Sequence, residues 1–433
     1  MPHNTLNAGL MNFIQASPTP YHAVSNLSSA LDDAGFLRLE EGRAWQLVKK
    51  QGYYVVRGGT SIVAFKTGEA DLVESGIHMV GAHTDSPCLK VKPQPDIIRE
   101  QYVQLGVEVY GGVLLNPWFD RDLSLAGRVD YRDQSGHLKH VLVNFENPIA
   151  VIPSLAIHLD REANDNRSVN AQTYLPVILS QAGNDKSFNL KDMLLAHLRD
   201  ELGLSQADKV LAFDLRFYDV QPPALVGLNQ EFIACARLDN LLSCYVGLQS
   251  LLNSEDRFAS LLVCTDHEEV GSVSANGAKG PFLEAALERM VEQLSAGSGE
   301  AKRRMLDNST FYSVDNAHGI HPNFRDKHDD KHGPLLNKGP VIKINGNQRY
   351  ATSSETSAMF RQLCEVNEIP VQAFVVRSDM GCGSTIGPIV AGELGVKTLD
   401  LGVPTFAMHS IRELAGSQDP AHLTRALTAF YNR

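Results

Sequence analysis

Residues 233–433 alternate between short apolar runs and helical stretches, and this alternation constrains the fold more than any other feature of the chain. The apolar runs are Ala259–Thr265, Thr310–Val314, Val341–Ile344, Val371–Val376 and Thr398–Leu401. The helical stretches are Leu241–Leu252, Pro281–Leu294, Ser354–Asn367 and Ala421–Tyr431. Strands that alternate with helices form a mostly parallel sheet covered on both faces. We therefore predict an α/β fold in which a mostly parallel sheet lies between two layers of helices.

Residues 93–232 follow a different pattern, which predicts a separate, β-rich segment. Strand-like runs with turn residues between them cover Tyr102–Tyr110, Leu125–Tyr131 and Leu138–Phe145. A chain of 433 residues is long enough for two or three domains. We predict two, an α/β domain in two parts, residues 1–92 and 233–433, and a β-rich domain inserted at residues 93–232.

Charge and composition exclude several classes of protein. The chain has 39 Lys and Arg against 50 Asp and Glu, a net charge of −11, whereas proteins that bind nucleic-acid backbones depend on clustered Lys and Arg. No run approaches the roughly 18 apolar residues of a membrane helix. Residues 1–19 hold no Lys or Arg, and the six cysteines form no C-x-x-C pair. We therefore expect a cytoplasmic protein with reduced thiols that binds neither nucleic acid nor membrane.

Common catalytic fingerprints are absent from the sequence. The chain has neither the phosphate-binding G-x-x-x-x-G-K-[ST] nor the nucleophile elbow G-x-S-x-G. Residues 267–271 begin like the zinc-binding helix H-E-x-x-H, but Gly271 stands where the second His would be. The chemistry must therefore come from residues that are distant in the sequence.

Metal-binding side chains stand at the ends of five apolar strands or in the loops that follow them. They are His83 with Asp85, Asp239, Glu268 with Glu269, Asp315, and His409. The carboxyl ends of strands in an open α/β sheet border the functional crevice, so we expect these side chains to converge. Two His and three carboxylates suit a pair of Zn²⁺ ions bridged by one carboxylate. Taken singly, each residue is also explained as a structural His, a turn or N-cap Asp, or a solvent-exposed Glu.

Five phrases in this order resemble the motifs of the M18 metallopeptidases, the aspartyl aminopeptidase family. The phrases are GAHTDSP (81–87), ARLDN (236–240), DHEEVGS (266–272), SVDNAH (313–318) and AMHSIRE (407–413). The resemblance extends over essentially the whole chain, including the insert and the stretch NKGPVIKIN (337–345). It implies a metal-dependent aminopeptidase that acts on peptides with a free N-terminus.

The resemblance also implies the roles of the site residues. One zinc ion would be held by His83 and Asp315, the other by Glu269 and His409, and both by Asp239. Co²⁺ or Mn²⁺ are possible substitutes for Zn²⁺.

Residues beside the ligands receive roles from the same resemblance. Asp85 would orient the His83 ring by accepting its other N–H. Glu268 would be the general base, which takes a proton from water and returns it to the leaving amine. The family does not use the position of His267 as a ligand, so we take His267 as structural.

The insert is expected to build the oligomer. Family members assemble from dimers into a tetrahedral dodecamer, and a histidine from the insert of one subunit reaches the active site of its neighbour. The matching phrase is AIHLDR (156–161), so His158 is the candidate residue. His158 would donate a hydrogen bond to the scissile carbonyl. An ordinary strand or turn histidine is the alternative.

The resemblance further implies a preference for N-terminal Asp or Glu, whose side chain needs a cationic partner. Lys343 is our first candidate and Arg349 our second, with the loop 381–385 at the border of the pocket. A strand-edge lysine that reaches solvent is the alternative for Lys343. Two other functions stay open, a dizinc hydrolase of N-acyl amino acids or other small amides, and a non-enzymatic assembly protein with structural metals. A non-ligand base such as Glu268 argues against the second of these.

Overall fold

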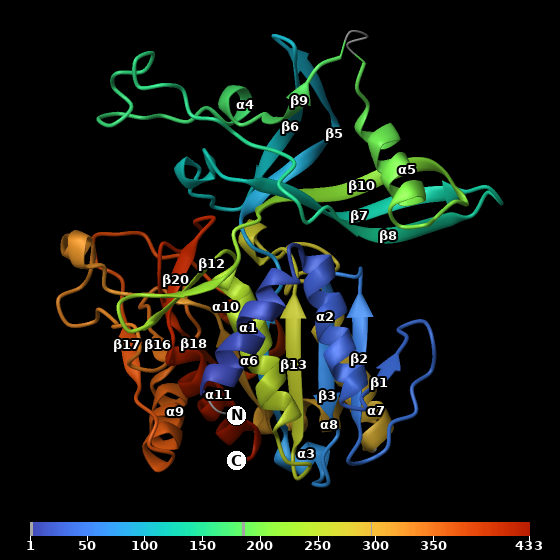
Figure 1. Ribbon diagram of the computed structural model, residues 1–433. Coiled ribbons are helices and arrows are strands. Elements are labelled where there is room, and N and C mark those ends of the chain that lie inside the picture. Colours follow the sequence, from blue (N-terminus) through green and yellow to red (C-terminus); the bar gives the residue numbers. More distant parts are fainter. Residues whose placement is uncertain (1–2, 184–186, 296) are drawn as a thin grey trace. The chain divides into compact units, whose positions relative to one another are not determined.

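The structure is a computed structural model that describes residues 3–183, 187–295 and 297–433. The chain divides into two compact units (Figure 1). Unit 1 comprises Met1–Ser86, Pro223–Met408 and Glu413–Arg433, and unit 2 comprises Pro87–Pro222 and His409–Arg412.

A nine-stranded sheet forms the centre of unit 1. In spatial order its strands are β1 (Leu37–Leu39), β2 (Gly52–Arg57), β3 (Ser61–Lys66), β13 (Ala259–Thr265), β4 (Ile77–His83), β14 (Thr310–Val314), β18 (Lys397–Gly402), β16 (Val341–Lys343) and β17 (Gln372–Phe374). The four central strands β13, β4, β14 and β18 are parallel, whereas β3 and β16 run antiparallel to their inner neighbours. The carboxyl ends of the central strands therefore meet at one edge of the sheet, as the sequence predicted.

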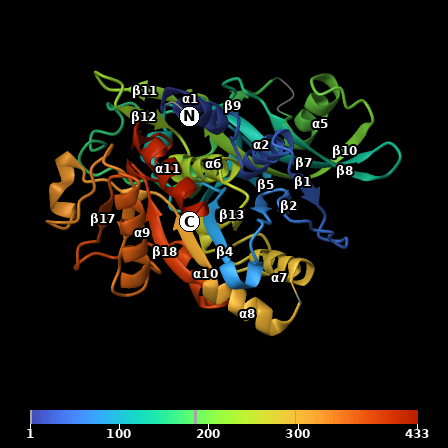
Figure 2. The ribbon, with the colours of Figure 1, turned by 90° about the horizontal axis from the view of Figure 1, so that it is seen from below.

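Helices cover both faces of this sheet (Figures 1 and 2). The first face packs against α1 (His3–Gln15), α2 (Pro20–Asp33), α6 (Leu238–Leu252), α9 (Ser354–Val366) and α11 (Asp419–Tyr431). The second packs against α3 (Leu72–Ser75), α7 (Phe282–Leu294), α8 (Gly299–Asn308) and α10 (Ile386–Leu394). Successive residues of β13 alternate between the two cores, Leu262 and Cys264 in the first, Leu261 and Val263 in the second. This double burial explains the uninterrupted apolar runs and confirms the predicted α/β fold.

A second, five-stranded sheet in unit 1 was not predicted. Its order is β11 (Ala224–Val226), β12 (Phe232–Cys235), β20 (Glu413–Gly416), β19 (Pro404–Phe406) and β15 (Ala317–His318). These strands are two to four residues long, too short for an alternating pattern to stand out in the sequence. Short 3₁₀ helices occur at Asn116–Trp118, Glu268–Val270 and Pro322–Lys327. Within the described ranges no helix combines the length and apolar character that a membrane span needs.

Unit 2 is built on a six-stranded antiparallel sheet. In spatial order its strands are β8 (Leu138–Asn144), β7 (Leu123–Asp133), β10 (Ala207–Asp219), β5 (Cys88–Arg99), β6 (Tyr102–Tyr110) and β9 (Val177–Gln181). Its helices are α4 (Ala171–Tyr174) and α5 (Leu190–Asp200). The unit begins at Pro87, before position 93, because β5 continues through Pro93 and Pro95, where its pairing with β6 shifts register.

Candidate metal centre

Three predicted ligands lie together in unit 1. Nitrogen and oxygen atoms of His83, Asp239 and Glu269 all lie within 4.8 Å of one another. The Nε2 atom of His83 lies 3.4 Å from Asp239 Oδ1 and 3.7 Å from Asp315 Oδ1. One imidazole and three carboxylates, from segments up to 232 residues apart in the chain, thus meet at one point. This donor set suits zinc.

Strand order explains why these segments meet. His83 ends β4, which lies between β13 and β14 and pairs in parallel with both. Glu268 and Glu269 follow β13, and Asp315 follows β14. His267 and Gly271 have positive φ, 64° and 99°, and between them they form the tight turn that carries both glutamates.

The His83 ring is oriented by the main chain as well as by Asp85. Its Nδ1 atom lies 2.9 Å from the carbonyl oxygen of Asp85 and 3.4 Å from Asp85 Oδ1. A carbonyl oxygen can only accept, so Nδ1 carries the hydrogen and Nε2 faces the carboxylates. The Asp85 carboxylate also accepts hydrogen bonds from the main-chain N–H groups of Glu268 and Glu269, both at 3.2 Å. Asp85 therefore holds the glutamate turn, a role that the sequence did not reveal.

Burial and mutual repulsion shift the protonation equilibria of these acids. Burial, together with the carboxylates of Asp315 and Asp239 and against the opposing charge of His83, raises the pKa of Glu268 to about 8. Burial and the nearby Asp239 raise the pKa of Glu269 well above its usual value. The raised pKa values show that the ionised carboxylates lack sufficient counter-charge from the protein, and a bound metal cation would supply it.

Glu268 lies beside the predicted ligands but is not part of the group formed by His83, Asp239 and Glu269. Its Oε2 atom is 3.9 Å from His83 Nε2, and its side chain is 14% exposed. An acid in this position can exchange protons with solvent, whereas His83 and Asp239 are buried.

His409 belongs to unit 2. Its Nδ1 atom lies 3.1 Å from the carbonyl oxygen of Gly112, so this nitrogen is the donor and Nε2 is the candidate ligand atom. The group formed by His83, Asp239 and Glu269 does not include it.

His158 is also in unit 2, where it lies exposed in a loop. Three apolar neighbours share this exposure, Leu155 at 60%, Ile157 at 48% and Leu159 at 75%. Exposed apolar side chains at this density mark a surface suited to a protein partner.

Lys343 is buried rather than open to solvent. Its ammonium donates to the Asp315 carboxylate at 3.2 Å and to the carbonyl oxygens of Asp315 and Asn316 at 3.1 and 2.9 Å. It thus holds a predicted zinc ligand. Arg349 is exposed and donates to the carbonyl of Cys382 in the loop 381–385.

Three residues beside the ligands escaped the sequence analysis. Ser86 donates to the carbonyl of Asp239 at 2.6 Å, and the Glu413 carboxylate accepts from the Asp239 N–H at 3.0 Å. Asn240 donates to the carbonyl of Val314 at 2.8 Å, just before Asp315. All three lie within the motifs quoted above, but nothing in the sequence distinguishes them from ordinary polar residues.

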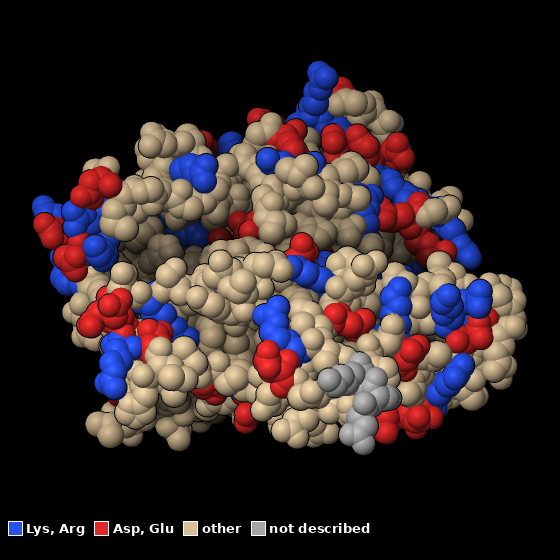
Figure 3. Space-filling model, turned by 90° about the horizontal axis from the view of Figure 1, so that it is seen from above, with Lys and Arg blue, Asp and Glu red and all other residues tan. Residues whose placement is uncertain are grey.

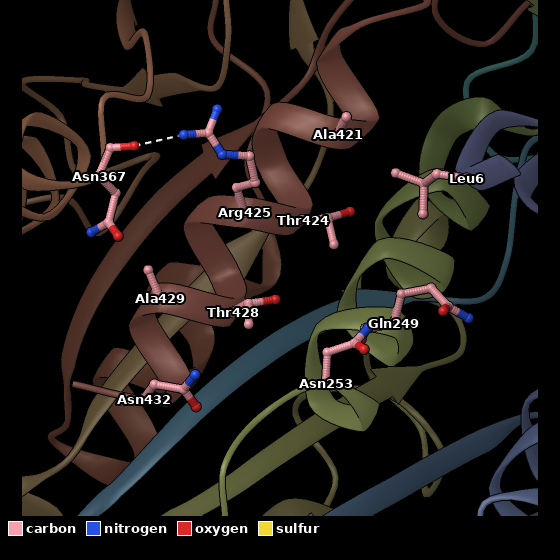
Figure 4. A pocket seen from close by; sticks show the side chains of 10 residues that line it. All are labelled: Leu6, Gln249, Asn253, Asn367, Ala421, Thr424, Arg425, Thr428, Ala429 and Asn432. Atoms are coloured by element: carbon pink, nitrogen blue, oxygen red, sulfur yellow. Dashed lines mark hydrogen bonds between the residues drawn. The ribbon is translucent and has the colours of Figure 1, made fainter. Parts of the chain in front are cut away.

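Among the cavities formed by described residues, two lie in unit 1 and are not lined by the predicted ligands. One, of about 290 Å³, is lined by His318, His321, Lys327, His328 and Arg377 among others. The guanidinium of Arg377 is paired with Asp379 at 2.6 Å. The other cavity, of about 470 Å³, lies along α6 and α11, and there Arg425 donates to the carbonyl of Asn367 at 2.6 Å (Figure 4). None of the predicted site residues lines the second cavity.

Acidic and basic side chains are interspersed over the face shown in Figure 3.

Known proteins match the chain over nearly its full length. A family model described as aminopeptidase I zinc metalloprotease (M18) matches residues 13–431. A protein of Pseudomonas entomophila (strain L48) named "Probable M18 family aminopeptidase 2" is 58% identical over 428 residues, which are 99% of this chain and 98% of that protein.

Solved structures agree in fold. The M18 aminopeptidase of Thermotoga maritima is 25% identical, with a TM-score of 0.87 over 99% of this chain and 96% of that one. A chain from a structure described as the S. cerevisiae mApe1 dodecamer is 29% identical, with a TM-score of 0.86 over the same shares.

Proposed function

The chain belongs to the M18 family of zinc metallopeptidases and is a metal-dependent aminopeptidase, and from this premise we propose that it uses two zinc ions and prefers N-terminal Asp and Glu. The observation that carries the proposal is the group of His83, Asp239 and Glu269, the first two of them buried, with Asp315 beside it and Glu268 next to it. A site that served only to stabilise the fold would need the ligands but no additional acid.

The predicted ligands divide between two ions. His83 and Asp315 would hold one zinc ion, Glu269 and His409 the other, and Asp239 both. When bound, zinc supplies the Lewis acidity that activates water and polarises the peptide carbonyl.

Glu268 would move the protons of the reaction. Its carboxylate takes a proton from the attacking water and delivers it to the nitrogen of the leaving peptide. Its position beside the ligands and its contact with solvent support this role. Asp85 keeps the carboxylate in reach, because it holds the main chain of Glu268.

Preference for acidic N-termini requires a cation that meets the substrate carboxylate. Lys343 stays our first candidate and Arg349 the second. Three oxygens of Asp315 and Asn316 already accept from the buried Lys343, so a direct bond to the substrate carboxylate would require its ammonium to exchange one of these acceptors.

Self-association would complete the site. We propose that the loop around His158 packs against a second copy of the chain, which would bring His158 to the partner's scissile carbonyl, and that dimers assemble into a dodecamer. The exposed Leu155, Ile157 and Leu159 support a protein contact at this loop. Light scattering should give the mass of twelve subunits of 47.4 kDa. A monomer would contradict both the assembly and the role of His158.

One set of assays tests the function. The purified protein is given aminoacyl chromogenic substrates with Asp, Glu, Ala, Leu or Lys at the N-terminus, and the corresponding N-acetyl amino acids, with and without chelator. We expect the highest kcat/KM for Asp and Glu, no turnover of N-acetylated compounds, and no activity after chelation. Preference for N-acetyl compounds would favour the small-amide hydrolase, and no turnover of any substrate would favour the assembly protein.

A further inference from the structure

We propose that Ser86 and Glu413 are positioning residues for the metal centre, because they hold the two peptide groups that flank Asp239 and so direct its carboxylate toward His83. The inference rests on the proposed binding of metal by Asp239. Neither side chain is among the predicted ligands.

Both main-chain polar groups of Asp239, its N–H and its carbonyl, are hydrogen-bonded to buried side chains. Glu413 lies at the start of β20 and is 2% exposed, and its Oε2 atom accepts from the Asp239 N–H at 3.0 Å. Ser86 is 6% exposed, and its Oγ atom donates to the Asp239 carbonyl at 2.6 Å. Both main-chain groups of one ligand are thus bonded to side chains from segments more than 150 residues away in the chain.

The conformation of Asp239 differs from that of the helix that follows it. Its φ and ψ are −84° and 105°, in the extended range, where α6 has a kink. With helical ψ its main-chain groups and its carboxylate would point elsewhere. The bonds from Ser86 and Glu413 hold the extended conformation against the neighbouring helix.

The choice of an acid at position 413 is the second observation. A main-chain N–H is satisfied by any neutral acceptor, and a buried carboxylate is costly, the more so near Asp239 and Glu269. A carboxylate forms the stronger bond to an N–H group and adds negative charge beside a site for cations.

The tethers also join the ligand-bearing segments to one another. Ser86 follows His83 by three residues, and Asn240 bonds to Val314, which precedes Asp315. Ser86 therefore links the His83 segment to the Asp239 segment, which Asn240 links to the Asp315 segment. Loss of one tether should loosen the ligand set without removing any ligand.

The test measures the zinc affinity of Ser86→Ala and Glu413→Gln. Each full-length protein is stripped of metal and titrated with zinc against a chromogenic chelator, and the visible spectrum of the Co²⁺ form is recorded. We expect Kd for zinc to rise by about 10- to 100-fold in Ser86→Ala, which loses its tether, and by a smaller factor above twofold in Glu413→Gln, whose amide oxygen still accepts but carries no charge; both should show a weaker or shifted Co²⁺ band.

Two buried residues that hold main chain elsewhere provide matched controls. Ser250→Ala removes a hydroxyl that donates to the carbonyl of Val246 in the same helix α6. Asp419→Asn alters a carboxylate that accepts from the N–H groups of Asn337 and Gly339. Both controls should bind zinc within twofold of the parent protein.

Zinc affinities of Ser86→Ala and Glu413→Gln within twofold of the parent, even with a lowered Tm, would overturn the inference. If Glu413→Gln does not fold, Ser86→Ala decides alone. Absence of zinc binding in the parent protein, or binding that His83→Ala leaves unchanged, would instead reject the proposed metal centre itself.

Discussion

Gly402 offers a way to disturb the proposed metal centre without replacing any of its predicted ligands. It ends β18, where it pairs with Val341, and the neighbouring Leu401 carbonyl accepts the Asp315 N–H at 2.9 Å. A Cβ atom at position 402 would lie 1.8 Å from the carbonyl oxygen of Asp315 and 2.6 Å from its carbonyl carbon. Both atoms belong to the main chain, so no side-chain rotation relieves the clash. Gly402→Ala must therefore displace the main chain of Asp315.

The size of the effect follows from these distances. Cβ atoms keep at least 3.0 Å from such neighbours, so the two atoms must separate by about 1.2 Å. The displaced carbonyl also accepts from Lys343 at 3.1 Å, so this bond is strained as well. Overpacking of this kind costs about 1–3 kcal/mol of stability. Misplacement of a reacting group by 1 Å costs about 100-fold in rate, so we expect kcat/KM to fall by about 100-fold.

The assay combines kcat/KM on an aspartyl chromogenic substrate, zinc content and thermal unfolding. The control is Gly392→Ala in α10, where a Cβ atom meets nothing within 4 Å. It should leave kcat/KM unchanged and stabilise the helix by about 0.5–1 kcal/mol. A Gly402→Ala variant with full zinc content and kcat/KM within twofold of the parent would refute the reasoning. Global unfolding would refute it too, because the clash is confined to one strand end.

Three further predictions address the chemistry and the stability of the protein. Glu268→Gln should lower kcat by about 10²- to 10⁴-fold and keep the zinc content of the parent, and loss of zinc would make Glu268 a ligand rather than a base. Chelation should lower Tm along with activity, because the acids then face one another without a counter-charge, and added zinc should restore both. Burial and the charge of Arg237 lower the pKa of His22 to about 4, below its value of 6.5 in the unfolded chain. The unfolded chain therefore binds more protons between these values, and stability falls as pH falls from 6.5 toward 4, by about 2–3 kcal/mol. Urea unfolding of the metal-free parent protein and of His22→Gln at pH 7 and 4.5 checks this. The free energy of unfolding should fall less in His22→Gln than in the parent, and an equal fall in both would contradict the prediction.

The sequence predicted those features of the centre that depend on local pattern. The runs that became β4, β13 and β14 are mostly apolar along their whole length, because both faces of the sheet are buried. The polar residues at the end of each run were therefore visible in the sequence. His83 ends one such run, the pair Glu268 and Glu269 follows another within four residues, and the rule that strand ends border the crevice places them together. Residues that contact each other across a long separation in the sequence leave no such local pattern. That Glu413 reaches Asp239 depends on the pairing of β20 with β12, both of which are only four residues long.

Proline illustrates a second reason why sequence reasoning falls short. The predicted boundary at position 93 coincides with a proline, a residue that cannot donate to a strand ladder. The structure accommodates it at a shift in the register between β5 and β6, where no donor is required. Whether a proline ends a strand thus depends on the partner strand, which local pattern does not specify.

The ligand segments are held by protein groups alone. Asp85 bonds to the main chain of Glu268 and Glu269, Ser86 and Glu413 to that of Asp239, and Lys343 to the carbonyl of Asp315. Each of these bonds joins two segments, and none of them requires a metal ion. A site held in this way loses little conformational freedom when cations bind, so more of the electrostatic attraction of the buried acids appears as affinity. The acids would repel one another without cations, and the main-chain bonds are what keep them together until cations arrive.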